Sequence, residues 1–167
     1  MITDRYPGDN STTLPTAEKL YLDSQRHLIV PSINLYSLLC SENGKSVCKQ
    51  FFGRNGKNIA LGIASYTSIE PFDVPILDDK GSITFTEFNE QIHAVHHVAR
   101  LPKGIPNPKD RPQLELPWRV EFMVSYQENK YCTLENLRQA FAMGGILGLG
   151  TFRPFYGRYE MTLFELI

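Results

Sequence analysis

Two arginines and two aromatic residues near the C-terminal end of the sequence have the chemistry to bind a nucleic-acid strand. The stretch GGILGLGTFRPFYGRYEM (residues 144–161) interleaves Arg153, Phe155, Tyr156 and Arg158 with five glycines. Guanidinium groups neutralise phosphates, and aromatic rings stack on bases. Glycines let a backbone approach a phosphodiester closely enough for amide N–H groups to donate to it. This pattern therefore predicts a binding loop for RNA or single-stranded nucleic acid.

The same glycines do not form a nucleotide-binding motif. A GxGxxG fingerprint follows a strand and opens a helix, because the pyrophosphate lies at the helix N-terminus. Here the glycines follow an expected helix and precede an expected strand. Gly44-Lys45-Ser46 lacks the upstream glycine of a Walker loop. The alternative interpretation is structural: Gly144 or Gly145 ends a helix, a β-turn follows, and the rings fill the core.

A second basic segment lies far away in the sequence. The stretch GKSVCKQFFGRNGKN (residues 44–58) carries Lys45, Arg54 and Lys57 and contains no acidic residue. Residues 70–90, by contrast, carry six acidic residues against Lys80 alone. Such charge blocks are commonly solvated faces, and the basic ones gain weight from the glycines and aromatics that accompany them.

Three histidines raise the question of metal or nuclease chemistry, although a histidine-bearing strand is more commonly a polar face of a sheet. His93, His96 and His97 fall on an expected strand, where His93 and His97 share one face and His96 points to the other. Three convergent metal ligands are therefore awkward, and no carboxylate stands at metal-ligand spacing. A histidine can serve as general base in metal-independent RNA cleavage, so this activity stays open as an alternative. We assign no catalytic residue, no metal site and no cofactor.

Length, net charge and cysteine content exclude several classes of protein. The 167 residues suffice for one hydrophobic core, and the formal net charge of −1 disfavours binding duplex DNA through bulk charge. Three cysteines without a CxxC pair indicate neither a disulfide framework nor a cysteine zinc site. The polar N-terminus has no secretory apolar region, and no apolar run is long enough to span a membrane. We expect a cytoplasmic protein with no membrane partner.

Patterns of apolar residues predict an α+β fold. Residues 1–16 resemble a flexible arm, and 17–167 are expected to form one domain with an insertion at about 70–116. In the N-terminal half we expect a short strand, a turn at residues 23–25, a strand His27–Val30, a helix from an N-cap at Ser32 through Cys40, a second helix at residues 46–52 and a strand Ile59–Tyr66.

The C-terminal half is predicted as strand, helix, glycine-rich loop, strand. Residues 90–98 are β-like, and the five prolines of Leu101–Pro117 indicate an exposed loop or hairpin tip. Trp118–Tyr126 alternates apolar and polar residues, Thr133 is expected to cap a helix, and Arg158–Ile167 is expected to be the last strand. The order predicts a ferredoxin-like antiparallel sheet with two helices.

The glycine-rich loop at residues 148–159 and the segment LIVPSINL (residues 28–35) each resemble a motif of the RAMP superfamily of CRISPR-associated proteins. The loop consists of Gly148-Leu149-Gly150, a six-residue spacer and Gly157-Arg158-Tyr159, similar to the family's glycine-rich loop before the last strand. The segment LIVPSINL resembles the family's IPGSSLKG segment that opens the first helix. Ser32 stands where a glycine is usual, and the basic residue of that segment is missing. RAMP-like proteins of bacteriophages are more similar still, sharing an IPS.NL-type opening, a GKN turn and an RP.YGR.E ending; together these matches cover about a quarter of the chain.

The resemblance implies a ferredoxin-like (RRM-like) fold and a role in binding RNA. It favours a non-enzymatic RNA or single-stranded nucleic-acid binding protein that assembles along the strand as a homo-oligomer or filament, in the host cytoplasm if a phage encodes it. A metal-independent ribonuclease, or a phage protein-interaction domain that retains the fold, are the alternatives. The expected contacts are Lys45, Arg54, Lys57, Gly148, Gly150, Arg153, Phe155, Tyr156, Gly157 and Arg158.

Overall fold

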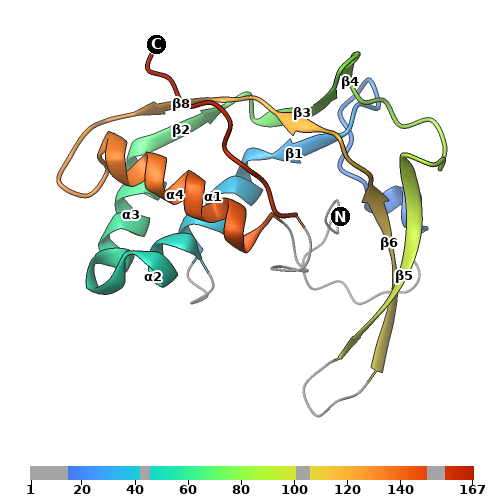
Figure 1. Cartoon of the computed structure of the whole chain (residues 1–167), viewed down its shortest axis with the longest axis horizontal. Helices are drawn as coiled ribbons and strands as arrows, with labels where there is room; N and C mark the ends of the chain where they lie inside the picture. The colour runs from blue at the N-terminus through green and yellow to red at the C-terminus, as the bar shows by residue number, and fades with distance from the viewer. Residues whose placement is uncertain (1–14, 42–45, 101–105, 150–156) are drawn as a thin grey trace. The chain divides into compact units, whose positions relative to one another are not determined.

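The computed structural model describes residues 15–41, 46–100, 106–149 and 157–167. The chain divides into two compact units, which we call unit 1 (residues 1–30 and 75–121) and unit 2 (residues 31–74 and 122–167). The described residues combine α-helices with antiparallel strands, which confirms the predicted α+β class (Figure 1). The proposed arm falls largely on residues 1–14, outside the described part, and a single domain over 17–167 stays a prediction.

Unit 1 is built on a small sheet and a long hairpin. The sheet consists of β1 (Ile29–Pro31), β3 (Asp73–Asp78), β4 (Gly81–Ser82) and β7 (Arg119–Val120), with β3 as the strand that the others join. The predicted turn at residues 23–25 is confirmed: one oxygen of the Asp23 carboxylate accepts the backbone N–H groups of Gln25 and His27, each at 2.8 Å. An apolar cluster underlies the sheet and consists of Leu20, Leu28, Ile76, Ile83, Phe85, Ile92 and Leu114.

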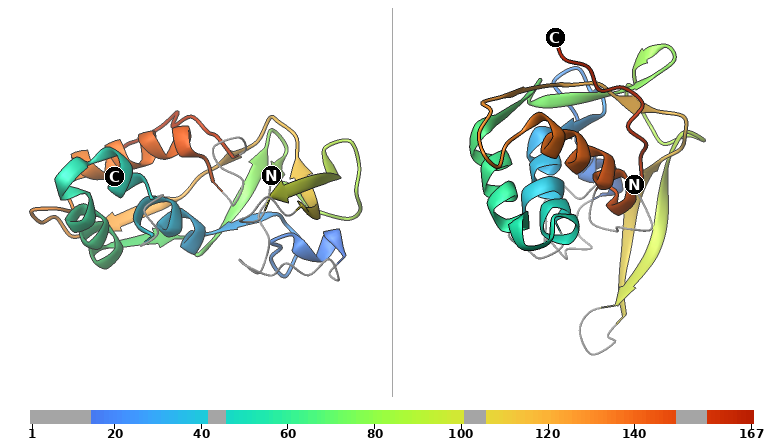
Figure 2. Two further views of the ribbon diagram at one scale, coloured as in Figure 1. Left: turned by 90° about the horizontal axis from the view of Figure 1, so that it is seen from below. Right: turned by 60° about the vertical axis from the view of Figure 1, so that its left-hand side comes forward.

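The hairpin consists of β5 (Ile92–Arg100) and β6 (Pro106–Leu114), which pair antiparallel over nine residue pairs (Figure 2). The β-like assignment of residues 90–98 is therefore confirmed. The assignment of Leu101–Pro117 as a loop is wrong for β6, although this region does lie at a hairpin. Prolines are tolerated in β6 because they occupy alternate positions, whose N–H side faces away from β5.

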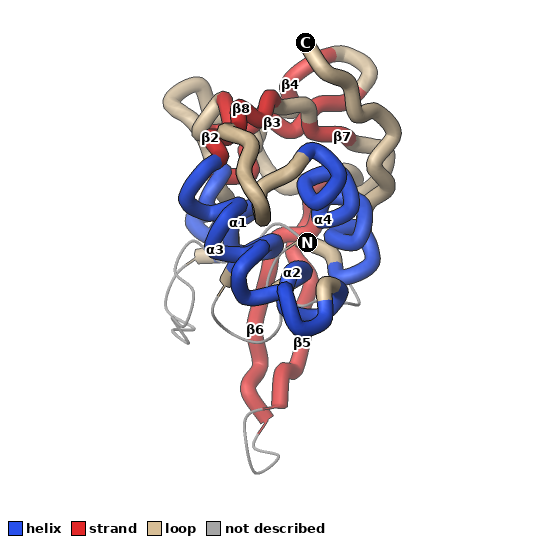
Figure 3. Tube along the Cα trace, turned by 90° about the vertical axis from the view of Figure 1, so that its left-hand side faces the viewer, coloured by secondary structure: helices blue, strands red, loops and turns tan. Residues whose placement is uncertain are grey.

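Unit 2 gathers the helices (Figure 3). They are α1 (Ser32–Cys40), α2 (Val47–Phe51), α3 (Gly56–Tyr66) and α4 (Leu134–Leu147), with a short 3₁₀ turn, η2 (Gly53–Asn55), between α2 and α3. A second 3₁₀ turn, η1 (Thr16–Lys19), belongs to unit 1. Strands β2 (Thr67–Glu70) and β8 (Met123–Tyr126) form a separate two-stranded sheet. The buried side chains of the four helices include Leu38, Leu39, Ile63, Leu137 and Phe141.

The predicted strand Ile59–Tyr66 is wrong, because this segment belongs to α3. Ile59, Ala60 and Ile63 are buried while Leu61 is exposed, which is a helical pattern of burial rather than an alternating one. Only two β-branched residues occur in this run, so little in the local sequence opposes a helix. Glycine at position 62 also lets Tyr131 pack closely against α3, since a Cβ there would lie 3.0 Å from the Tyr131 Cβ.

The predicted last strand, Arg158–Ile167, is also wrong, because none of its residues is part of a strand. Near its start the segment bonds to α4 instead, because the Tyr159 N–H donates to the Gly145 carbonyl at 3.4 Å. The ferredoxin-like fold was expected to have two helices, and the segment assignments gave three, whereas the described residues contain four α-helices. They also contain three separate sheets rather than one.

The strand predicted over Trp118–Tyr126 divides into β7 and β8 at residues 121 and 122, and these halves fall in different units. Its predicted alternation is confirmed all the same. Trp118, Val120, Phe122, Val124 and Tyr126 are each half-buried, and the residues between them are exposed.

The two predicted N-caps have different outcomes. Thr133 caps α4 as predicted, with its hydroxyl accepting the Asn136 N–H at 3.2 Å. Ser32 is not a cap but the first residue of α1, and its own N–H donates to the Phe72 carbonyl at 2.7 Å. Pro31 takes the N-cap position there, without a side-chain hydrogen bond.

The three cysteines are free thiols that belong to unit 2. A hydrogen bond between Cys40 and Cys48, together with burial, raises the pKa of the Cys40 thiol. Burial also raises the pKa of Cys132. Among the described residues, no helix combines the length and the hydropathy needed to cross a membrane.

Candidate nucleic-acid interface

The glycines at 144 and 145 do not end the preceding helix. Both are buried within α4, which continues to Leu147 and is capped by Gly148. Gly148 has φ +81°, the left-handed conformation that favours glycine, and its N–H donates to the Gly144 carbonyl at 2.8 Å. The structural interpretation was therefore right that this stretch holds a helix C-cap, but wrong about which glycine forms it.

Gly144 and Gly145 allow the returning chain to lie directly on α4. A Cβ at Gly144 would collide with the Tyr159 hydroxyl, and a Cβ at Gly145 would collide with the Tyr159 carbonyl oxygen. Tyr159 is held at both ends, since its hydroxyl donates to the Phe141 carbonyl at 2.7 Å and its N–H donates to Gly145. Burial raises the pKa of this phenol above its usual value of 10.0. This close approach explains two of the glycines by packing alone.

Gly157 closes the base of the glycine-rich loop. Its carbonyl accepts the Leu149 N–H at 2.8 Å, and its φ of +72° lies in the left-handed region. A Cβ at this position would collide with the Leu149 carbonyl oxygen. This hydrogen bond joins residues 149 and 157, and we call the closed base that they form the loop stem. The stem places Arg158 immediately beside α4.

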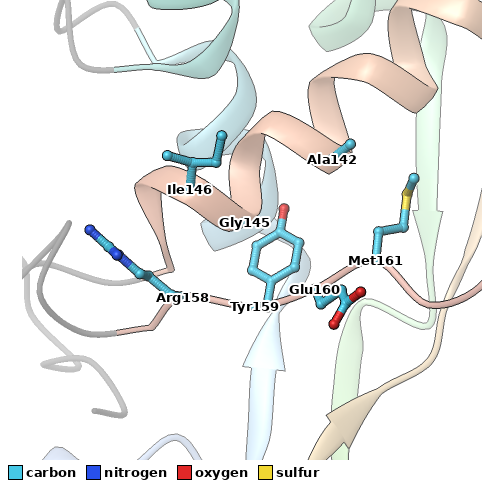
Figure 4. Close-up of a pocket in the computed structure, with 7 residues that line it drawn as sticks. All are labelled: Ala142, Gly145, Ile146, Arg158, Tyr159, Glu160 and Met161. Atoms are coloured by element: carbon cyan, nitrogen blue, oxygen red, sulfur yellow. The ribbon is translucent and has the colours of Figure 1, made fainter.

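A groove open to solvent runs between α4 and the segment that follows the stem (Figure 4). Its volume is about 440 Å³, and its lining is formed by Ala142, Gly145, Ile146, Arg158, Tyr159, Glu160 and Met161. Arg158 and Ile146 lie at one end, and Ala142 and Met161 at the other. The Arg158 side chain points away from the Tyr159 ring and is exposed. The groove thus combines apolar walls with one cation, Arg158, and one carboxylate, Glu160. The apolar walls suit a planar base, and the cation suits a phosphate next to it.

The second basic segment begins α3. Arg54 lies in η2 and Lys57 in the first turn of α3, and both side chains are exposed. Residues 46–66 contain no acidic residue, so no carboxylate of this segment neutralises them. The first N–H groups of an α-helix lack intrahelical partners, which adds partial positive charge at the same place. The arrangement can attract a phosphate.

Half of the predicted contact residues can be placed. Gly148, Gly157 and Arg158 come together at the loop stem, whereas Arg54 and Lys57 are neighbours at the start of α3. Both groups belong to unit 2, and α2 packs against both α3 and α4. The remaining predicted contacts lie outside the described residues: Lys45, Gly150, Arg153, Phe155 and Tyr156.

The histidines are placed elsewhere. His96 Nδ1 lies 2.7 Å from a carboxylate oxygen of Asp110 within the β5–β6 hairpin. His93 Nε2 lies 3.4 Å from a carboxylate oxygen of Glu115, the residue that follows β6. All four histidines of the sequence fall in unit 1, so unit 2 supplies no imidazole to the groove. Within the described ranges, no three histidine, cysteine or acidic side chains are grouped so that they could hold a metal ion.

Sequence reasoning did not single out Ala142, Ile146 and Met161 as part of this surface. The signal was available in the spacing: Ala142 and Ile146 stand four residues apart on the exposed side of a helix whose other side is buried. What the sequence could not indicate was that the chain returns along that helix.

Comparisons with protein-family models, with curated proteins and with solved structures give no match to this chain.

Proposed function

We propose that this protein binds RNA or single-stranded nucleic acid without catalysing a reaction, and that it self-assembles along the strand. The observation that carries the proposal is the loop stem, which holds the exposed Arg158 beside a partly apolar groove on α4. A guanidinium there can contact a phosphate while a neighbouring base rests on apolar atoms. The exposed Arg54 and Lys57 supply a second place for the backbone of the same strand.

A relationship to the RAMP superfamily, with its ferredoxin-like fold, is part of the same proposal. That family places its opening helix beside its glycine-rich loop. In this chain the corresponding helix α1 packs against α4, and a Cβ at Gly144 would lie 3.1 Å from a Leu38 methyl carbon. This adjacency supports the relationship but does not require a role in a CRISPR complex.

Binding is best tested by fluorescence anisotropy with labelled oligouridylate and oligothymidylate over a series of salt concentrations. Arg158→Ala and Lys57→Ala should each weaken binding with little dependence on base sequence, because phosphate contacts carry no sequence information. The slope of log K against log salt should shrink by about 0.7 for each phosphate that the variant no longer neutralises. The matched control is Lys80→Ala, which removes an exposed lysine from a turn in unit 1.

A double variant, Arg153→Ala/Arg158→Ala, tests the glycine-rich loop as a whole. If this variant is folded and still binds both oligonucleotides as tightly as the wild type at every salt concentration, the loop is structural and the proposal is wrong. The same reactions, run in a chelator and analysed on a denaturing gel, distinguish binding from cleavage. Intact strands are expected, since the groove has no imidazole from its own unit.

A further inference from the structure

The two outer edges of the β5–β6 hairpin differ in a way that indicates a protein interface. Each strand of a two-stranded ribbon pairs on one side only, so each has an outer row of N–H and C=O groups. The direction of these groups can be read from three contacts. The Glu115 N–H donates to the Gln91 carbonyl, the Ile92 N–H faces Asn89 instead of β6, and the Asp110 carbonyl accepts the Lys19 ammonium at 2.8 Å. Odd-numbered residues therefore pair within the ribbon, and even-numbered residues face outward.

The outer edge of β6 is protected against further pairing. Its outward positions include Pro106, Pro108 and Pro112, which have no N–H to donate. Between these prolines, the outward carbonyl of Asp110 accepts the Lys19 ammonium. Packing of η1 against β6 covers this edge further. Prolines and covering segments are the usual means by which proteins prevent edge-to-edge association.

The outer edge of β5 carries none of this protection. Its outward residues Ala94, His96 and Val98 all retain their N–H groups, and all three are exposed. Within the described part of the chain, β6 is the only strand that pairs with β5. No lysine or proline interrupts residues 92–98, and the Val98 side chain is 56% exposed. A ribbon of two strands is marginally stable alone and gains from a third.

We propose that β5 pairs with β5 of a second copy of this chain, forming a continuous β6–β5–β5–β6 sheet across a two-fold axis. The edge is self-complementary: a register centred on His96 places Ala94 of one copy opposite Val98 of the other, so that exposed apolar residues meet across the strands. The acidic side chain nearest the axis, Asp110, lies one strand away from it and is paired with His96 at 2.7 Å. The two copies therefore bring no unpaired carboxylates together.

This interface rests on the self-association in the proposed function but does not depend on nucleic-acid binding. It is therefore measured without nucleic acid, by sedimentation velocity over a range of protein concentrations. The wild-type chain should form a dimer as the concentration rises. The test variant, Ala94→Pro/Val98→Pro, removes two outward N–H groups per copy and leaves the ladder with β6 intact, since β6 itself carries prolines at this parity. It should weaken dimerisation at least about tenfold.

The matched control, Ala94→Ser/Val98→Thr, changes the same side chains but keeps both N–H groups and should retain the dimer. Circular dichroism establishes that both variants are folded. In the wild type, hydrogen exchange at residues 94, 96 and 98 should slow as the protein concentration rises. A monomeric wild type, a folded proline variant that dimerises like the wild type, or exchange that is slow at every concentration would each overturn the proposal. The last outcome would mean that another segment of the same chain covers the edge.

Anisotropy on the same proline variant separates the two proposals. If the interface exists and the groove binds nucleic acid, the variant should still bind a short oligonucleotide while losing its dimer. Loss of oligonucleotide binding in Arg158→Ala with an unchanged dimer would support the groove and leave the β5 interface unaffected.

Discussion

Gly145 is the residue at which packing and helix propensity make opposite predictions. Alanine is a better helix former than glycine by about 1 kcal/mol, so Gly145→Ala should stabilise α4 if propensity dominated. The new Cβ would instead collide with the backbone carbonyl of Tyr159, which cannot rotate away as a side chain can. We expect a net loss of about 1–3 kcal/mol in the free energy of unfolding, measured by urea denaturation.

Ala142, an exposed residue of α4, provides the control for the stability of Gly145→Ala. Ala142→Gly lies on the same helix and should cost about 1 kcal/mol through propensity alone. If Gly145→Ala proved as stable as the wild type or more so, the approach of residues 158–161 to α4 would be looser than the structure indicates.

Tyr159 should give the stability a specific dependence on alkaline pH. Its folded-state pKa is raised by burial, so the folded protein keeps the phenol neutral where the unfolded chain, with a pKa near 10.0, ionises. The stability that this group contributes is fully present below pH 10.0 and is lost as the pH rises toward the folded-state pKa. Urea denaturation between neutral and alkaline pH should show this loss.

In Tyr159→Phe this part of the pH dependence should disappear, and the free energy of unfolding at neutral pH should fall by about 0.5–1.5 kcal/mol because the hydrogen bond to Phe141 is removed. Tyr66→Phe is the control, since that ring is 47% exposed. Equal alkaline slopes in the wild type and Tyr159→Phe would show that this phenol does not determine the pH response.

At the scale of elements, α4 positions the groove and the loop stem, and its start depends on one cap. Thr133→Ala removes the acceptor of the Asn136 N–H and should cost about 1 kcal/mol in thermal or urea unfolding. Thr133→Ser keeps a hydroxyl and should recover most of that loss. If alanine and serine behave alike, the hydrogen bond at this cap contributes little.

Elements with a strong local signal were predictable from the sequence, and those decided by distant contacts were not. Thr133 followed by an amphipathic run identified α4, and the alternation over residues 118–126 identified the faces of β7 and β8. The segment 158–167 alternates like a strand, yet its first residues bind the backbone of α4 through Tyr159. That outcome depends on Gly144 and Gly145 permitting close approach, which no local pattern reveals.

The residues of the candidate site also separate into those that the sequence predicted and those that it did not. Glycines at 148 and 157 and the cation at 158 were predicted because residue type alone limits what they can do. The apolar wall formed by Ala142, Ile146 and Met161 was not predicted, since it requires knowing that two segments run side by side. Prolines in β6 misled the prediction because their effect depends on which side of the strand they face.

At the scale of the whole molecule, charge is divided unequally between the two units. Unit 1 carries nine lysines and arginines against eleven acidic residues, whereas unit 2 carries eight against seven. The overall charge of −1 therefore conceals a slightly positive unit 2 and a negative unit 1, so the proposed phosphate contacts are better placed in unit 2. The groove, the loop stem and the start of α3 all belong to that unit.

Each unit also has its own buried cluster, so local destabilisation should remain within one of them. Leu137, 2% exposed, lies in the core of unit 2, and Ile92, 1% exposed, lies in the core of unit 1. Leu137→Ala should cost about 2–5 kcal/mol and should speed hydrogen exchange in α1, α3 and α4. Ile92→Ala should instead speed exchange in β3, β5 and β6. If either variant accelerated exchange equally throughout the chain, the two clusters would open as one cooperative core, and the division into units would describe geometry without describing stability.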